Sequence, residues 1–202
     1  MAAGEGRRLR PLTERYAKPV LPIEGRPVIV TLLQELRAAG IERVTVVTGH
    51  LAEQVERLLD GFPLELRFVR QPEPLGSADA VRLGLQGLPA VVVAADTVFS
   101  TGDLGRFAAL DGHAIAARRD PAPAPPHRYA LGISEGRVTR VLDDDPANPL
   151  ASAPLWRLGD SFDPALLEEL GGPPFELSQA FQRLVDAGET VHGIEIGPTR
   201  DL

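Results

Sequence analysis

An alternation of apolar helix and strand patterns in the first half of the chain constrains the fold most. Residues 27–39 repeat apolar side chains at helical spacing and end at Gly40, and residues 43–48 (RVTVVT) have the pattern of a buried strand. The alternation continues with expected helices at 52–59 and 77–85 and expected strands at 64–69 and 90–95. Strands that alternate with helices and are apolar on both faces predict a parallel α/β sheet.

The second half of the chain continues this pattern less regularly. A helix at 104–110 and a strand at 114–117 are expected before the Pro-rich residues 120–128, which predict a surface loop. Two strands around a turn at 134–136 then indicate a hairpin, so we expect the sheet to become mixed here. The remaining expected elements are strands at 129–133, 137–142, 155–158 and 191–196 and helices at 164–170 and 177–187.

The length and apolar content of the chain suit one compact domain. With 202 residues and 44% hydrophobic content, the chain is long enough to bury one substantial core. We therefore expect a single domain over residues 1–202. The expected class is α/β, with a three-layer αβα architecture and a Rossmann-like sheet that is mixed but mostly parallel.

Composition excludes several classes of function. The absence of cysteine rules out disulfides, thiolate nucleophiles and Cys-based zinc sites, and it favours a cytoplasmic location. No apolar run is long enough to span a bilayer, so no membrane partner is expected. A formal net charge of -7 argues against nucleic acid as a partner.

Basic residues nevertheless gather near the start of the chain, where a glycine loop is also expected. Because ligands of open α/β sheets bind at the carboxyl ends of strands, backbone N–H groups of such a loop can bind phosphate there. The stretch AAGEGRRLRPLTERYAKP therefore predicts an anion site in an acidic protein. The basic residues of this stretch are Arg7, Arg8, Arg10, Arg15 and Lys18.

Residues 2–19 resemble the signature of the sugar-phosphate nucleotidyltransferases, which reads roughly LAAGxGTRLRPLTxxxPKP. This family includes glucose-1-phosphate thymidylyltransferases and mannose-1-phosphate guanylyltransferases. The resemblance continues through KPVLPIEGRPVI at 18–29, QPEPLGSADAV at 71–81 and VVVAADTVF at 91–99, and it weakens beyond about Leu142. It implies the fold of the nucleotide-diphospho-sugar transferases. It also implies transfer of a nucleoside monophosphate from an NTP to a sugar 1-phosphate, with release of pyrophosphate.

The resemblance assigns roles to individual residues. Arg8 would neutralise the phosphates and the departing pyrophosphate, and Lys18 would hold phosphate charge near the reacting centre. Gln71 would read the edge of the nucleobase, which would pack over Gly76. The nucleotide-binding set implied by the resemblance is Ala2, Ala3, Gly4, Gly6, Arg8, Gln71, Gly76 and Ser77.

The resemblance also implies a Mg²⁺ site. Asp96 follows five apolar residues, which puts a carboxylate at the carboxyl end of an expected central strand. The second metal carboxylate of the family lies in a WxDxGT motif, and GIEIGPT at 193–199 is similar to it, which makes Glu195 the expected second ligand. Glu195 is a departure from the family, because glutamate is one methylene longer than aspartate.

The sugar side departs further from the family pattern. The stretch LDDDP at 142–146 corresponds to an EKP-like motif of the family, which would give Asp144 the role of a sugar-hydroxyl contact. Asp145 then stands at the position of a lysine that would contact the sugar phosphate. Trp156 is a candidate to pack against a sugar ring. The candidates to replace the lysine charge are Arg118, Arg128 and Arg157.

Other functions stay open at this stage. A phosphorylated alditol or aminoalcohol as acceptor for cytidylyl transfer would explain the lost lysine. A catalytically weak module that binds nucleotides or nucleotide sugars would explain Glu195 and Asp145, and a molybdopterin-type cytidylyl or guanylyl transferase shares the loop and the sheet. The family motif also follows an apolar strand at the sheet centre, so the first strand is expected to be truncated here. Assembly into oligomers is possible.

Overall fold

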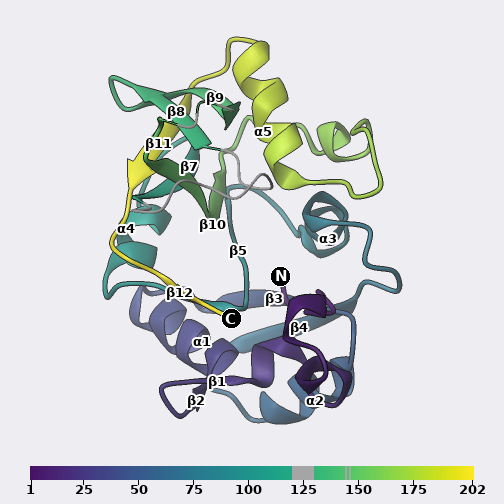
Figure 1. The fold of residues 1–202 in the computed structure, drawn as a ribbon. Helices are drawn as coiled ribbons and strands as arrows, with labels where there is room; N and C mark the ends of the chain where they lie inside the picture. Colours follow the sequence, from purple (N-terminus) through teal and green to yellow (C-terminus); the bar gives the residue numbers. More distant parts are fainter. Residues whose placement is uncertain (120–129, 144, 146) are drawn as a thin grey trace.

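The computed structural model describes residues 1–119, 130–143, 145 and 147–202. Figure 1 shows two strands, β3 and β4, beside the N-terminus, and a larger group of strands further along the chain. The α-helices are α1 (Val28–Ala38), α2 (Ala52–Leu58), α3 (Ser77–Gly84), α4 (Asp103–Ala108) and α5 (Leu177–Asp186). None of the helices in the described ranges is long and apolar enough to cross a membrane.

The strands form one six-stranded sheet and three two-stranded sheets. The six-stranded sheet has the order β5-β10-β7-β11-β9-β8, and the pairs are β3–β4, β1–β2 and β6–β12. The strands are β1 (Pro22–Ile23), β2 (Arg26–Pro27), β3 (Arg43–Thr48), β4 (Glu65–Arg70), β5 (Ala90–Val93), β6 (Thr97–Val98), β7 (His113–Arg119), β8 (Ala130–Ser134), β9 (Arg137–Asp143), β10 (Leu150–Leu158), β11 (Val191–Glu195) and β12 (Arg200–Asp201).

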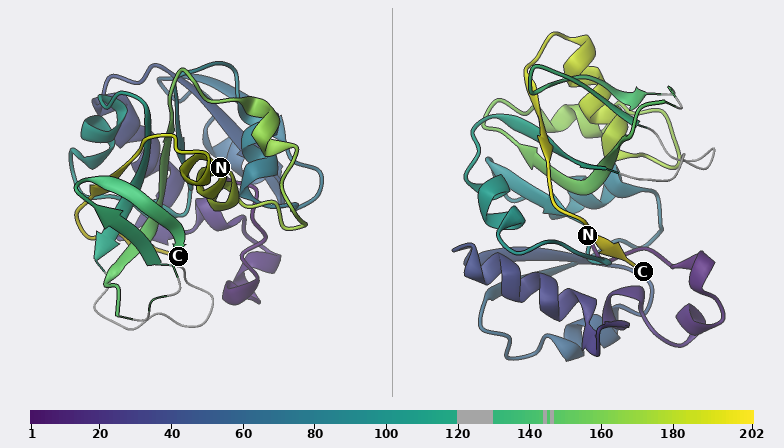
Figure 2. Two further views of the ribbon diagram at one scale, coloured as in Figure 1. Left: turned by 90° about the horizontal axis from the view of Figure 1, so that it is seen from above. Right: turned by 60° about the vertical axis from the view of Figure 1, so that its left-hand side comes forward.

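Helices pack against both faces of the six-stranded sheet, so alternate residues of its strands enter two different apolar cores. In β7, Ala114 and Ala116 belong to one apolar cluster, and Ile115 and Ala117 belong to another. The first cluster includes buried residues of α1, α2 and α4, and the second includes those of α3 and α5. This alternation with a period of two gives the expected three layers, and the right-hand view of Figure 2 shows helices below and above the strands.

The expected helices begin and end for local reasons. In α1, Ile29, Leu32, Leu33 and Leu36 are buried on one face, and the helix is followed by Gly40 with φ of 80°. At the start of α5, Glu176 and Gln179 form a capping box. The helix expected at 164–170 is wrong in type, since only the short 3-10 helix Pro164–Leu167 forms there.

The prediction of a mostly parallel sheet is not confirmed. Among the described strands, β3 pairs in parallel with β4 and β11 with β7. All the other pairs of the described strands are antiparallel, and β10, which lies between β5 and β7, runs against both. β10 is also longer than the four residues expected at 155–158, and its pairing with β7 shifts register between Ser152 and Trp156. The six-stranded sheet is therefore mixed.

Candidate active site

The residues expected to bind nucleotide line one cavity of about 560 Å³. Gln71 enters it directly after β4, and Asp96 enters it from the loop after β5. The carboxyl ends of strands thus contribute side chains to a single cavity, as they do in other open α/β sheets. The expected residues in this lining are Ala2, Ala3, Gly4, Gly6, Arg8, Lys18, Gln71, Gly76, Ser77 and Asp96.

The two glycines of the first loop, Gly4 and Gly6, differ in what surrounds them. Gly6 has φ of 63°, and a Cβ there would lie 2.8 Å from Cγ2 of Thr13, whose hydroxyl donates to the Gly6 carbonyl (2.9 Å). A Cβ on Gly4 would meet no protein atom within 4 Å. Gly6 is therefore required by the loop itself, whereas the space beside Gly4 is open to a ligand.

The basic residues of the loop differ in their pairing. Glu5 accepts a hydrogen bond from Arg7 (2.7 Å) and lies 3.6 Å from Arg10, and the bond with Arg7 lowers the pKa of the half-buried Glu5 carboxyl. Arg8 is exposed and, among the described residues, has no hydrogen-bond or ion-pair partner. Arg8 is thus the cation of this loop that is available to an anion in the cavity.

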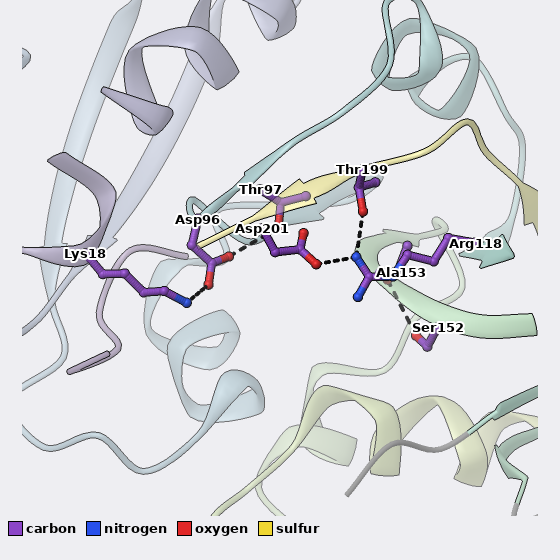
Figure 3. Close-up of polar contacts among 8 residues, drawn as sticks. All are labelled: Lys18, Asp96, Thr97, Arg118, Ser152, Ala153, Thr199 and Asp201. Atoms are coloured by element: carbon purple, nitrogen blue, oxygen red, sulfur yellow. Dashed lines mark hydrogen bonds and ion pairs between the residues drawn. The ribbon is translucent and has the colours of Figure 1, made fainter. Parts of the chain in front are cut away.

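Lys18 forms an ion pair with Asp96 at the other side of the cavity (Figure 3). The Lys18 side chain is only 13% exposed, against 28% for Asp96, so water screens this pair less than a surface pair. The other Asp96 oxygen accepts from the Thr97 hydroxyl at 3.3 Å. This contact joins Lys18, the residue expected to hold phosphate charge, to Asp96, the expected metal ligand.

The donor chemistry at Asp96 fits a hard cation that keeps other oxygen ligands. No group of three or more His, Cys, Asp or Glu side chains within the described ranges is arranged to hold a metal. Mg²⁺ is commonly bound through one or two carboxylates together with substrate phosphates and water. Asp96, which lines a cavity of about 560 Å³, satisfies that requirement.

Gln71 is held in one orientation by a buried carboxylate. Its Nε2 donates to Oδ2 of Asp79 (2.7 Å) and to the carbonyl of Gly76 (3.1 Å), and the Gln71 residue is 5% exposed. Asp79 also accepts from Arg82 at 2.8 Å. Because these bonds occupy the Nε2 group, Gln71 offers its Oε1 as an acceptor to a ligand.

Position 76 requires glycine because of the local backbone structure. Its φ is 115°, and a Cβ there would lie 2.3 Å from the carbonyl oxygen of Phe175. Leu75 and Ala78 bond to the backbone of Phe175 on either side (2.7 and 2.8 Å). The close approach of these two backbones requires glycine even without a ligand.

The family model described as "Nucleotidyl transferase" matches residues 1–118, which hold the whole cavity lining except Glu176 and Leu202. The chain belongs to the nucleotidyl transferase family.

Relatives within this family differ in what their names say they act on. The chain is 30% identical over 217 residues to a glucose-1-phosphate thymidylyltransferase of Streptomyces griseus, with 97% of this chain and 59% of that enzyme covered. It is 31% identical over 176 residues to a CMP-5'-(3-aminopropyl)phosphonate synthase of Streptomyces rubellomurinus, with 80% of this chain and 28% of that protein covered. The chain therefore spans well under two thirds of the length of these relatives.

A solved structure shows the same fold. The inositol-1-phosphate CTP transferase from T. maritima superposes with a TM-score of 0.84 over 100% of this chain and 86% of that chain. Sequence identity between the two is 18%, so this likeness concerns the fold alone. It supports the nucleotidyltransferase α/β fold for this member of the nucleotidyl transferase family.

Glu176 is a cavity residue that sequence reasoning missed. Its carboxylate accepts from the Ser77 hydroxyl (2.5 Å), and the same hydroxyl accepts from the Leu177 amide (2.8 Å). Glu176 lies beyond the family-model match and carried no motif. A polar residue immediately before the apolar pattern of α5 was the one available signal, since such residues cap helices.

Glu195 does not line the cavity that contains Asp96. It lies at the end of β11, and its carboxylate accepts from Nε and Nη2 of Arg119 at 3.1 and 3.0 Å. The chain then returns to Asp96 through β12, where the Leu202 amide donates to the Asp96 carbonyl (3.1 Å). Asp201, two residues after the stretch that resembles the family motif, lies on the strand beside Thr97, whereas Glu195 does not.

Arg118 is engaged by this returning strand. Its Nη1 donates to the Thr199 hydroxyl (2.6 Å) and forms an ion pair with Asp201 (Figure 3). Of the candidates to replace the missing lysine, Arg118 is thus already paired. Arg157 is 8% exposed, and its Nη1 donates to the Ala108 carbonyl (2.9 Å) away from the nucleotide cavity.

Of the remaining sugar-side candidates, the two that the structure describes, Trp156 and Asp145, do not line this cavity. Trp156 is 9% exposed and belongs to the core that includes α3 and α5. Its ring is therefore a packing group in this structure. Asp145 is exposed, and Asp144 and Arg128 lie outside the described residues.

Proposed function

We propose that this protein transfers a nucleoside monophosphate from an NTP to a sugar 1-phosphate, forming an NDP-sugar and releasing pyrophosphate. The observation that carries the proposal is the single cavity that combines the glycine loop, the free Arg8, the Lys18–Asp96 pair and Gln71. The relative named glucose-1-phosphate thymidylyltransferase supports the sugar phosphate as acceptor.

In the proposed reaction, a phosphate oxygen of the acceptor attacks the α-phosphorus in line, and the bond to pyrophosphate breaks. The attacking oxygen is already ionised, so no general base and no covalent enzyme intermediate are needed. Arg8 and the backbone N–H groups near Gly4 bind the phosphates, and Lys18 keeps a positive charge at the reacting centre. Mg²⁺ held at Asp96 would neutralise phosphate charge.

A second candidate is cytidylyl transfer to a phosphorylated alditol or to an aminoalkyl phosphate or phosphonate. It is favoured by the relative named CMP-5'-(3-aminopropyl)phosphonate synthase and by the acidic, exposed Asp145 where the family pattern has a lysine. An acceptor with an amino group would tolerate an acidic side chain that repels a sugar phosphate. The two candidates share the nucleotide cavity and differ in the acceptor and the base.

Pyrophosphate release tests the proposal. We would measure it with Mg²⁺, the five common NTPs and a panel of sugar 1-phosphates, alditol phosphates and aminoalkylphosphonates. Release should depend on a sugar 1-phosphate and disappear in Asp96→Ala, while the exposed Asp111→Ala retains it. Release with CTP and a non-sugar acceptor alone would select the second candidate. Nucleotide binding without release for any acceptor would indicate a binding module instead.

A further inference from the structure

Residues 196–202 follow β11 and lead back to the loop that carries Asp96. They form β12, which pairs with β6 over two residues, so that Asp201 lies opposite Thr97. Beside this pair, the Leu202 amide donates to the Asp96 carbonyl (3.1 Å). β12 therefore holds the backbone of Asp96 and Thr97.

Pairing over two residues does not fix a strand by itself, because short two-stranded ladders are marginally stable in water. Side chains of α4 and of the loop before it fix the beginning of the segment. The Ser100 hydroxyl donates to the Pro198 carbonyl (2.9 Å). The Gly197 amide donates to the carboxylate of Asp103 (2.9 Å). Both bonds lie before β12, so β12 itself depends on further contacts.

Arg118 makes such a contact. Its Nη1 donates to the Thr199 hydroxyl (2.6 Å) and forms an ion pair with Asp201, so that one guanidinium group holds two residues of the segment (Figure 3). Arg118 lies near the end of β7, which pairs with β10 on one side and with β11 on the other. The side chains of Arg118 and Asp201 are 26% and 35% exposed, so water screens this pair less than a fully exposed pair.

The other ion pair of β12 is more exposed. Arg200 is paired with Glu24, and their side chains are 55% and 70% exposed. Pairs between exposed side chains contribute little to stability, because water screens them and both side chains lose conformational freedom. The pair with Arg118 is therefore the stronger of the two, and it ties β12 to the six-stranded sheet.

We propose that Arg118 is a positioning residue of the active site, which acts on Asp96 through β12. The guanidinium group holds Thr199 and Asp201, and the strand that follows Thr199 holds the Asp96 backbone. Figure 3 shows Asp201 between Asp96 and Arg118. The proposal rests on the proposed function in one respect, namely that Asp96 binds Mg²⁺. Because Mg²⁺ demands a near-ideal geometry of its oxygen ligands, loosening β12 weakens metal binding more than nucleotide binding.

Three variants test the proposal against the unaltered chain. Arg118→Met keeps an apolar stem and removes both bonds to the segment. Arg118→Lys keeps a positive charge that can pair with Asp201, although it lacks the planar fork of arginine. Arg183→Met is the matched control, because Arg183 also binds a backbone carbonyl and a carboxylate, both of Glu169. Neither Arg183 nor Glu169 lines the nucleotide cavity.

Two measurements are made on each chain. Hydrogen exchange of the Leu202 amide reports whether β12 holds Asp96. The Ala94 amide, which donates to the Pro154 carbonyl (3.0 Å), is the internal control. The second measurement is binding of each of the five common NTPs without Mg²⁺ and along a Mg²⁺ titration.

In Arg118→Met, exchange of the Leu202 amide should be about tenfold faster, whereas that of the Ala94 amide should stay unchanged. The Mg²⁺ concentration that half-saturates NTP binding should rise several-fold, while NTP affinity without Mg²⁺ stays the same. Arg118→Lys should lie between this variant and the unaltered chain, and Arg183→Met should match the unaltered chain.

Unchanged exchange of the Leu202 amide, or an unchanged Mg²⁺ requirement, in Arg118→Met would overturn the proposal. An equal loss of NTP affinity with and without Mg²⁺ would also overturn it, since that result describes a general loss of structure. NTP binding that does not respond to Mg²⁺ in the unaltered chain would contradict the proposed function instead. Exchange of the Leu202 amide would still decide whether Arg118 holds β12.

Discussion

At the scale of single residues, substitution of two cavity glycines, Gly76 and Gly4, distinguishes an effect on stability from an effect on ligand binding. Gly76→Ala places a Cβ against the Phe175 backbone at a φ of 115°, so it should lower the free energy of unfolding by about 2 to 4 kcal/mol. Gly4→Ala has open space for its methyl group and should leave stability within about 0.5 kcal/mol while weakening NTP binding. Urea unfolding and nucleotide titration of both variants check this. Equal stability losses would show that Gly4 is also a packing position.

The role of second metal ligand can also be tested at the scale of single residues. Glu195 is the expected ligand, and Asp201 is the carboxylate with which it is compared. If the resemblance holds, Glu195→Gln should raise the Mg²⁺ concentration for half-maximal pyrophosphate release several-fold. Asp201→Asn is the matched control, since each of the two carboxylates is bonded to an arginine. A change in Asp201→Asn alone would transfer the role to β12, which already lies beside Thr97.

At the scale of elements, α2 holds the loop that presents Lys18. Gln54 of α2 accepts from the Ala17 amide (2.8 Å) and donates to the Arg15 carbonyl (2.8 Å). Gln54→Ala leaves the buried Ala17 amide without this partner, so stability should fall by about 1 to 2 kcal/mol. The KM for NTP should also rise several-fold, because Lys18 loses its support. Gln86→Ala, at an exposed position, should change neither stability nor the KM for NTP. An unaltered KM in Gln54→Ala would show that α2 does not position Lys18 for nucleotide binding.

The elements also show how far sequence can predict this molecule. The apolar periods of α1 and β3 are local signals, and both formed within one or two residues of their predicted bounds. Most residues of the predicted anion site came from one contiguous motif, at 2–18, and they share one cavity. Strand order is set by contacts between distant residues, so the antiparallel position of β10 between β5 and β7 had no local signature. The bonds that connect Glu176 with Ser77 and Asp201 with Arg118 are equally long-range.

At the scale of the whole molecule, stability depends on the burial of the Met1 amine. This amine donates to the Val93 carbonyl (2.7 Å) beside a cavity of about 750 Å³ that residues of β3 and β5 line. Burial, opposed by the charge of Asp96, lowers the pKa of this amine from 8.0 to about 6. Between pH 6 and 8 the unfolded chain therefore binds more protons than the folded one, so stability rises with pH across that window and levels off on either side. Two pKa units correspond to about 2 to 3 kcal/mol.

Urea unfolding at pH 6 and pH 8.5 measures this rise, and acetylation of the Met1 amine provides the control. The acetylated chain has no charge to bury and should lose about 2 to 3 kcal/mol of the pH-dependent difference. Burial also lowers the pKa of His113, but that contribution is present in both chains and cancels in the comparison. Equal pH dependence in the two chains would mean that water enters the cavity between β3 and β5 and hydrates the amine. A smaller pH dependence after acetylation would mean that the Met1 amine is shielded from water. Its positive charge would then lower the stability of the chain near neutral pH.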